Sequence, residues 1–152
     1  MNVTSSVQPI PAVIGVVLRK QEVLLVRRAN PPDAGRWGLP GGKIEAGETI
    51  LEAAVREVHE ETAISVSPRN IFTALEAFDH GLEGELRQHF VLIAVLCEWL
   101  QGEPVAGDDA LDAQWVNLIE LERQNLVMSF GVRSVVRRAE ELTSAHTRQP
   151  SQ

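Results

Sequence analysis

Three glutamates at helical spacing are the residues of this sequence whose types and positions most directly suggest chemistry. Glu57, Glu60 and Glu61 crowd one side of a helical wheel drawn for residues 49–62. Like charges at this spacing destabilise an isolated helix by roughly a few tenths of a kcal/mol per pair. Water compensates for such repulsion on a solvated face. A divalent cation does so as well, since Mg²⁺ typically uses one or two carboxylates together with substrate phosphates.

The helix that carries these glutamates has its own start signal. Thr49 is an N-cap residue, and Glu52 follows three positions later in the capping-box pattern. Two glycines, Gly41 and Gly42, precede the helix and allow the backbone to come close to a metal or a phosphate. Glutamates on a rigid helix beside a glycine-bearing turn would suit a cation that holds phosphates.

The stretch that contains this turn and helix resembles the Nudix box. It agrees with that motif at six fixed positions and at two apolar ones. The fixed positions are Gly42, Glu48, Arg56, Glu57, Glu60 and Glu61, and the apolar positions are Val58 and Ile64. Chance agreement at the six fixed positions is on the order of one in ten thousand for a chain of this length. The run from Trp37 to Gly42 also resembles the lead-in of the family, and the similarity extends over residues 10–142.

One position departs from the motif. Ala63 stands where the box has glycine, which would suit a left-handed helix end. Alanine takes that conformation at a cost of about 1 kcal/mol or more. The departure puts the local turn in question and not the carboxylates.

The resemblance implies metal-binding roles for the acids of the box. Glu57 and Glu61, one turn apart, are the pair expected first, and Glu60 would be a third ligand or a proton acceptor. A backbone carbonyl of Gly41 or Gly42 would supply a further ligand. The cofactor expected from this set is Mg²⁺, with Mn²⁺ as a substitute.

Two further box residues would support the ligands. Arg56 resembles the arginine that holds the glutamates in place, for which its fixed charge and forked donors are suited. An ordinary surface ion pair is the alternative for Arg56. Glu48 would approach the metal or brace the turn, or would simply be an acid near a helix N-terminus.

The general base is left open by the sequence. Some relatives use a box glutamate, and others use an acid on a later loop. Asp108, Asp109 and Asp112 precede Trp115 in the region where such an acid occurs, and Glu76 on the strand after the helix is another option. Each of them alone is more often a solvated acid or a turn residue.

Substrate contacts outside the box are also candidates. Arg27 and Arg28 end a strand beside a proline-rich loop, where they could contact phosphate or a terminal ribose, or form a surface ion pair. Trp37 could stack on a base or pack in the core. His80 and His89 lack metal-ligand spacing and are expected to be structural.

The resemblance implies Mg²⁺-dependent hydrolysis of a phosphoanhydride bond by attack of water on phosphorus. The substrate expected first is a nucleoside diphosphate-linked compound such as ADP-ribose. The alternative is a nucleoside or deoxynucleoside triphosphate, cleaved to sanitise the nucleotide pool. A third alternative is a catalytically silent module that senses nucleotides.

The elements that must position these residues alternate between hairpins and helices. This order predicts an α/β (α+β) fold in which a mixed sheet lies between helices, and the resemblance implies the Nudix-like α/β/α sandwich. A short strand at residues 64–66 is expected to end before Pro68, and an amphipathic helix is expected over residues 129–142. Residues 9–143 would form one domain, with flexible ends at residues 1–8 and 144–152.

Composition bounds the remaining possibilities. The 152 residues suit one domain, and the net charge of -7 without a dominant basic patch argues against a nucleic-acid polymer as partner. Cys97 is the only cysteine and lies in an apolar run of eight residues, too short to span a membrane. These features predict a cytoplasmic protein with Cys97 packed as a small hydrophobe. The resemblance implies a small nucleotide as the binding partner, and a homodimer is the assembly considered.

Overall fold

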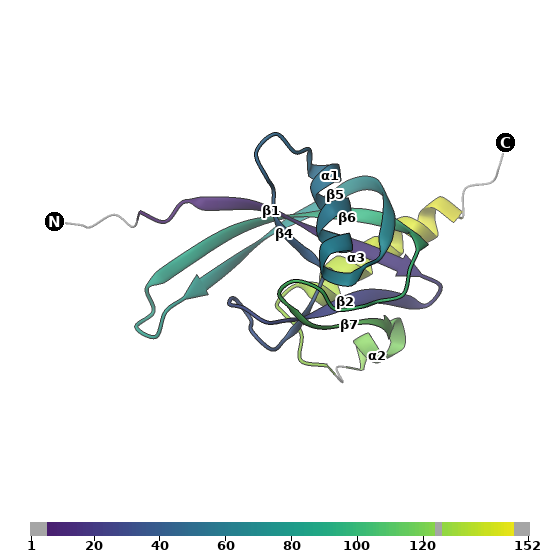
Figure 1. The fold of residues 1–152 in the computed structure, drawn as a ribbon. Coiled ribbons are helices and arrows are strands. Elements are labelled where there is room, and N and C mark those ends of the chain that lie inside the picture. The colour runs from purple at the N-terminus through teal and green to yellow at the C-terminus, as the bar shows by residue number, and fades with distance from the viewer. Residues whose placement is uncertain (1–5, 124–125, 148–152) are drawn as a thin grey trace.

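The computed structural model describes residues 6–123 and 126–147. This part of the chain forms seven strands and three helices. The strands are β1 (Pro9–Arg19), β2 (Glu22–Arg28), β3 (Trp37–Gly38), β4 (Gly41–Lys43), β5 (Ser65–His80), β6 (Leu86–Gln101) and β7 (Ala110–Asn117). The helices are α1 (Ile50–Thr62), α2 (Leu118–Glu122) and α3 (Val132–Thr147). Figure 1 shows one long twisted sheet with α1 and α3 on opposite faces, so the predicted α/β/α sandwich is confirmed.

Strand β1 runs through the middle of the sheet and changes partners along its length. On one edge it pairs in parallel with β6 over residues 9–18. On the other edge it pairs antiparallel with β2 only at residues 18–19 and with β4 at residues 12–14. Strand β2 turns away and pairs with β3 and β7 instead. A wedge therefore opens between β1 and β2, and the candidate site lies in it.

Alternate residues of β1 face the two helices, as expected for a strand buried on both sides. Val13 and Val17 belong to the apolar cluster under α1, which includes Val58. Ile14 and Val16 belong to the cluster under α3. Strand β1 thus contributes side chains to the packing against both helices.

Helix α1 packs very close to the sheet. A Cβ atom on Gly15 would lie 2.6 Å from Val58 Cγ2, so only glycine at this position of β1 allows the approach. Cys97 is buried in the same cluster, which confirms that it packs as a small hydrophobe. This close packing fixes the position of the helix that carries the box acids.

Both ends of α1 are closed by the signals seen in the sequence. Thr49 Oγ1 accepts a hydrogen bond from Glu52 N at 3.1 Å and Glu52 Oε1 accepts one from Thr49 N at 3.3 Å, so the capping box is confirmed. Ala63 adopts the left-handed conformation with φ 64°, and its N–H donates to His59 O at 2.9 Å. The alanine therefore keeps the turn that glycine would make, at a conformational cost of about 1–2 kcal/mol.

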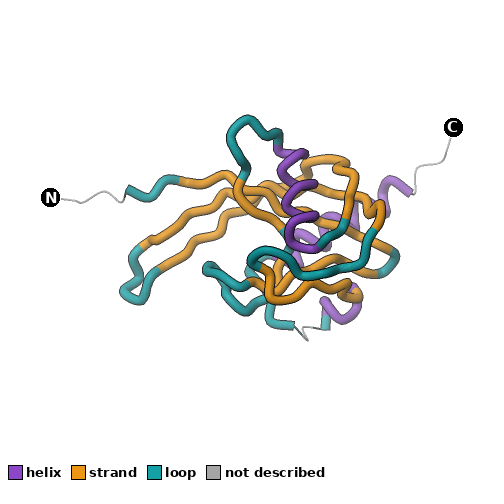
Figure 2. Tube along the Cα trace, viewed as in Figure 1, coloured by secondary structure: helices purple, strands orange, loops and turns teal. Residues whose placement is uncertain are grey.

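Strand β5 corrects one prediction. Pro68 does not stop a strand, because β5 runs through it from Ser65 to His80. The residue lies on an edge strand, and the pairing with β6 shifts register between Pro68 and Asn70. Edge strands and bulges tolerate the missing N–H of proline. Beyond the body of the molecule, β5 and β6 continue as a projecting hairpin, called here the hairpin arm (residues 75–92), seen most clearly in Figure 2.

The last helix also differs from the prediction. It begins at residue 132 and continues to residue 147, instead of covering 129–142. Part of the predicted flexible tail, residues 144–147, is therefore helical. The remainder of that tail, 148–152, and the first five residues of the predicted N-terminal tail lie outside the described residues.

Candidate active site

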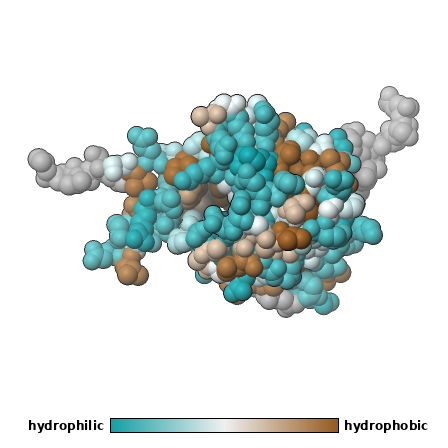
Figure 3. All heavy atoms as spheres, viewed as in Figure 1, coloured by the Kyte–Doolittle hydropathy of each residue, from teal (hydrophilic) through white to brown (hydrophobic). Residues whose placement is uncertain are grey.

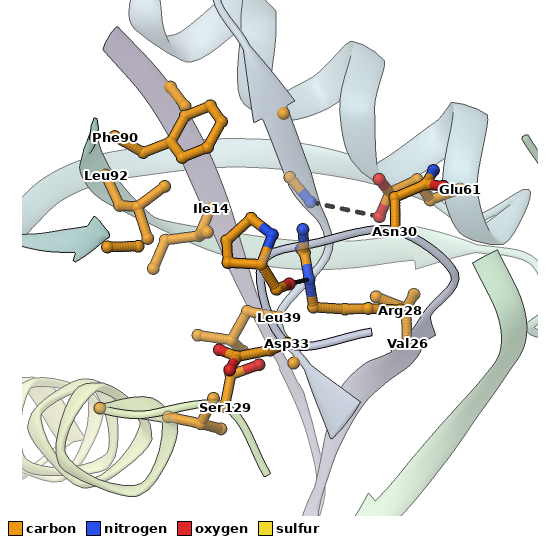
Figure 4. Close-up of a pocket in the computed structure, with 18 of the residues that line it drawn as sticks. Ile14, Val26, Arg28, Asn30, Asp33, Leu39, Glu61, Phe90, Leu92 and Ser129 are labelled. Carbon is orange, nitrogen blue, oxygen red and sulfur yellow. Dashed lines mark hydrogen bonds between the residues drawn. The ribbon is translucent and has the colours of Figure 1, made fainter. Parts of the chain in front are cut away.

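A cavity of about 390 Å³ occupies the wedge between β1 and β2, a size typical of small-molecule sites. Its walls come from β1, the end of β2 with the following loop, β4, the last turn of α1, the hairpin arm and the segment that leads into α3. Figure 4 shows Glu61 and Arg28 on one side of the cavity and the apolar Phe90 and Leu92 on the other. In the space-filling view the surface is hollowed between the hairpin arm and the body (Figure 3). The cavity thus has a charged end and an apolar end.

Glu61 forms the acidic part of the charged end. Its Oε2 accepts a hydrogen bond from Gly41 N at 3.3 Å (Figure 4). Burial raises the pKa of Glu61 to about 7, with the charges of Glu57 and Asp108 acting in the same direction, while the Gly41 bond and Arg28 oppose the shift. A carboxylate that is deprived of water and surrounded by other acids favours a nearby cation.

Glu57 lies beside Glu61 on the same side of α1 and faces Gly42. A Cβ atom on Gly42 would lie 2.6 Å from the Glu57 carboxyl carbon, so the backbone and the carboxylate are in close contact. Burial raises the pKa of Glu57, and the hydrogen bond from Arg56 opposes this effect. Gly41 is constrained more strongly, since a Cβ atom there would overlap the backbone carbonyl oxygen of Val13. The backbone packing therefore requires glycine at position 41, whereas a side chain at position 42 would displace the Glu57 carboxylate.

Arg56 joins the acids of the box into one network. Its Nε and Nη2 donate to the two carboxylate oxygens of Glu48 at 2.6 and 2.8 Å, and its Nη1 donates to Glu57 at 2.8 Å and to Glu60 at 3.1 Å. Nη2 also donates to Lys43 O at 3.1 Å, which ties the network to β4. With side chains only 13–21% exposed, the Glu48–Arg56–Glu57 part differs from an ordinary surface pair.

Glu48 binds Arg56 and does not line the cavity. The bond from Arg56, followed in size by the backbone bond from Glu45, lowers the pKa of Glu48 to about 2. Its Oε1 accepts from Glu45 N at 3.1 Å, which closes the turn before α1. The side chain is absent from the cavity lining. Of the three readings given for Glu48, bracing the turn is the one that matches these hydrogen bonds.

Arg56→Ala is expected to lower kcat/KM by about 10- to 100-fold, because losing a partner that orients metal ligands typically costs this much. Glu57 and Glu60 would lose the donor that they share, and Glu48 would lose the two hydrogen bonds of its bidentate pair with Arg56. Steady-state kinetics with and without added Mn²⁺ measure the effect. Arg56→Lys should recover only part of the loss, since an ammonium lacks the planar fork. A wild-type rate for Arg56→Ala would leave Arg56 as a structural ion pair.

The predicted substrate-binding residues divide into two groups. Arg27, Arg28 and Asp109 line the cavity. Backbone carbonyls of the loop after β2 fix both arginines: Arg27 Nε donates to Gly35 O at 3.1 Å and Arg28 Nε donates to Pro32 O at 2.7 Å. These three residues are placed where they can meet a ligand.

The structure places the other three away from the cavity lining. Trp37 packs against the apolar cluster under α3, in keeping with the core-packing alternative. The Asp112 carboxylate accepts from Ala113 N and Gln114 Nε2, each at 2.8 Å, and is satisfied within β7. Glu76 points from the hairpin arm with its side chain 57% exposed, 3.4 Å from His89. A residue that faces one side of a strand cannot also reach a cavity on the other side.

Several lining residues were not found from the sequence. The hairpin arm contributes Leu75, Ala77, Phe90 and Leu92, which alternate along β5 and β6 and so share one face. This alternation was visible in the sequence, but the sequence does not indicate that the face borders a ligand. Ser129 also lines the cavity, in a segment that was predicted to be helical.

Among the described residues, no three His, Cys, Asp or Glu side chains converge closely enough to hold a metal ion by themselves. A Mg²⁺ site needs less than that, because waters and substrate phosphates complete its coordination. Glu57 and Glu61 are two desolvated carboxylates that lie against the Gly41–Gly42 backbone. Glu60 is turned toward Arg56 at 3.1 Å and is 42% exposed. The donor chemistry of the first two fits a hard divalent cation. No helix among the described residues is long and apolar enough to cross a membrane.

Comparison with known proteins gives relatives with named activities. The ADP-ribose pyrophosphatase of Methanocaldococcus jannaschii is 35% identical over 115 residues, which cover 76% of this chain and 66% of the archaeal protein. The 8-oxo-dGTP diphosphatase of Escherichia coli is 32% identical over 110 residues, which cover 71% of this chain and 80% of the bacterial protein. The chain thus spans slightly less than two thirds of the archaeal relative.

Among solved structures, the chain resembles a bifunctional NMN adenylyltransferase/ADP ribose pyrophosphatase from Francisella tularensis, complexed with AMP and a Mn ion. The TM-score is 0.69 at 26% identity, and the match covers 89% of this chain and 42% of that one. The family model of the NUDIX domain matches residues 8–138, which include the helix, both glycines and the cavity walls up to α3. The chain therefore belongs to the Nudix family.

Proposed function

We propose that this chain hydrolyses a phosphoanhydride bond in a nucleoside diphosphate-linked substrate such as ADP-ribose. The observation that carries the proposal is the position of two desolvated carboxylates against the Gly41–Gly42 backbone: Glu61 lines the charged end of the cavity, and Glu57 lies beside it on α1. Glu57 and Glu61 would hold a divalent cation there, with a carbonyl of Gly41 or Gly42 as a further ligand. A bound cation of this kind neutralises phosphate charge and lowers the pKa of a water molecule.

The side chains of the protein have separate tasks in this proposal. Arg28, at the end of β2, lines the same charged end of the cavity as Glu61, where a fixed guanidinium would hold a phosphate oxygen. Arg56 keeps Glu57 and Glu60 oriented through its network. Glu60, at the edge of that network, or Asp109, in the cavity wall, would take the proton of the attacking water. Positioning and electrostatics would supply most of the rate.

The size and lining of the cavity support a nucleotide-linked substrate. Its apolar end, formed by the hairpin arm and by Ile14 and Leu39, would accept a base or another flat group. The names of the relatives support two substrate classes, an ADP-ribose-like diphosphate and an oxidised deoxynucleoside triphosphate. We place the ADP-ribose class first and keep the triphosphate as the second candidate, favoured by the bacterial relative that the chain covers more fully.

A panel of nucleotides tests the proposal directly. The purified chain would be incubated with ADP-ribose, NADH, 8-oxo-dGTP and common triphosphates, with and without Mg²⁺ or Mn²⁺. ADP-ribose should give AMP and ribose 5-phosphate only when metal is present, and ³¹P NMR in ¹⁸O-labelled water would identify the phosphorus attacked. Release of pyrophosphate from the triphosphates instead would favour the second candidate. Thermal stabilisation by nucleotides without turnover of any would reject both in favour of a silent sensor.

Three further properties belong to the proposal. They are magnesium as the natural ion with manganese as its substitute, a cytoplasmic location, and a homodimer as a possible assembly. Light scattering on the purified chain measures the last, and titration calorimetry with each ion measures the first.

A further inference from the structure

The loop between β6 and β7 (residues 102–109) is fixed at its start by an aromatic stack. The Arg19 guanidinium lies over the rings of Trp115 and Trp99, at 4.1 and 5.0 Å from their centroids. Its Nη1 donates to Glu103 Oε1 at 2.8 Å, and Trp99 Nε1 donates to Gly102 O at 3.0 Å. Cation–π and charge-assisted contacts of this kind restrain an otherwise exposed segment.

The middle of the loop rests on the last turn of α1. Val105 N donates to Thr62 O at 2.9 Å and Gly107 N donates to Glu61 O at 3.0 Å. Carbonyls in the last turn of a helix have no partner within the helix. The loop therefore supplies bonds that α1 cannot make for itself, and one of them goes to the backbone of a box glutamate.

Gly107 makes this contact possible. A Cβ atom on Gly107 would overlap the carbonyl oxygen of Glu60. Its φ lies outside the left-handed region, so close approach is what requires glycine here and not an unusual backbone. Any side chain at this position would push the loop away from α1.

The end of the loop carries acids to the candidate site. Asp108 is within electrostatic reach of Glu61 and has φ 48°, a left-handed value unusual for a residue with a side chain. Asp109 lines the cavity, and its carbonyl accepts from Ala29 N at 3.1 Å, next to Arg28. The loop is thus held at three places, and its last residue, Asp109, lines the cavity.

We propose that Gly107 is a positioning residue for the hydrolytic site. Its missing side chain lets the 102–109 loop rest on α1 and so sets the distance from Asp108 and Asp109 to Glu61. The inference rests on the proposed function, because it takes Glu57 and Glu61 as the metal carboxylates. Gly107 itself touches neither metal nor substrate and acts through the two aspartates.

Paramagnetic broadening of amide NMR signals by Mn²⁺ alone tests the inference without requiring turnover. Wild type is compared with Gly107→Ala and with Trp99→Phe, which keeps a ring beside Arg19 but loses the bond to Gly102. Ala106→Ser, at the exposed neighbouring position, is the control. The amides of Asp108 and Asp109 should be broadened in wild type and control and less so in both variants. Signals from α1 should be broadened equally in all four proteins.

Kinetics on the same folded proteins supply the second readout. Displacing the loop should lower kcat by about 10- to 100-fold in Gly107→Ala, with little change in KM. Equal broadening of the loop amides in wild type and both variants would overturn the inference. If Gly107→Ala does not fold, the comparison of wild type with Trp99→Phe provides the test. If α1 signals are not broadened even in wild type, the metal assignment of the proposed function is what fails, and the inference falls with it.

Discussion

Replacing Glu61 by glutamine is expected to lower kcat by about 100- to 1000-fold, because a metal ion contributes several kcal/mol of charge stabilisation to the reaction. Glutamine has the same shape and can keep an oxygen near Gly41 N, so the fold should persist. The lost charge is what matters, since an amide oxygen binds a hard cation more weakly than a carboxylate. Glu57→Gln should have an effect of similar size, because Glu57 is the other desolvated carboxylate beside the glycine turn.

Glu61→Gln should lower activity without lowering thermal stability, which distinguishes the loss of a metal ligand from damage to the fold. The folded pKa of Glu61, about 7, is raised above the ordinary value of 4.5. Folding therefore disfavours the ionised form of Glu61. This loss of folding stability is fully present above about pH 7 and disappears as the pH falls toward 4.5, the pKa in the unfolded chain. At pH 8 without metal, Glu61→Gln should have a Tm equal to or above that of wild type, and the difference should shrink toward pH 5.

Thermal melts at both pH values and kinetics at saturating Mg²⁺ measure these effects. Glu83→Gln, an exposed acid in the hairpin turn, is the matched control and should change neither quantity. Full activity in both Glu57→Gln and Glu61→Gln would reject these two residues as metal ligands, whatever the melts show.

The parts of the site that were predictable are those set by local chain chemistry. The capping box at Thr49 and the spacing of the glutamates fix a helix and one of its faces from sequence alone. The turn at Ala63 was in question because the motif has glycine there, and the structure keeps the left-handed turn, with carbonyls of the last helical turn bonded to the loop after β6. A motif therefore identifies a rigid local unit even where one residue departs from it.

The remaining parts depend on contacts between distant segments. Trp37, Glu76 and Asp112 have suitable chemistry, but strand direction decides which way each side chain points, and all three are outside the cavity lining. Conversely, Phe90 and Leu92 line the cavity because the hairpin arm leans over the wedge between β1 and β2, which no local pattern encodes. Register and twist of the sheet had to be known before either group could be assigned.

Gly42→Ala is the second change for which a large effect is expected, and it tests geometry without altering any charge. The new methyl group would lie 2.6 Å from the Glu57 carboxyl carbon and Oε1, closer than real contacts allow, so the carboxylate must move. The backbone at Gly42 is not left-handed, so alanine adds no conformational strain of its own. Metal affinity and kcat should each fall by about 10- to 100-fold, whereas stability should change little, because the group that must move is the flexible end of a side chain.

A shorter acid should partly relieve the clash, which makes the effect testable as a coupling between two positions. Glu57→Asp withdraws the carboxylate by one methylene and should be damaging alone, but less so in combination with Gly42→Ala than the two single effects predict. Titration with Mn²⁺ and kcat are measured for the wild type, both single variants and the double variant. Ala46→Ser, which adds one atom at an exposed position, controls for a small added group elsewhere in the same turn region. Strict additivity of the two changes would mean that Gly42 does not act through Glu57, and the glycine turn would then contribute to the site only through its own backbone.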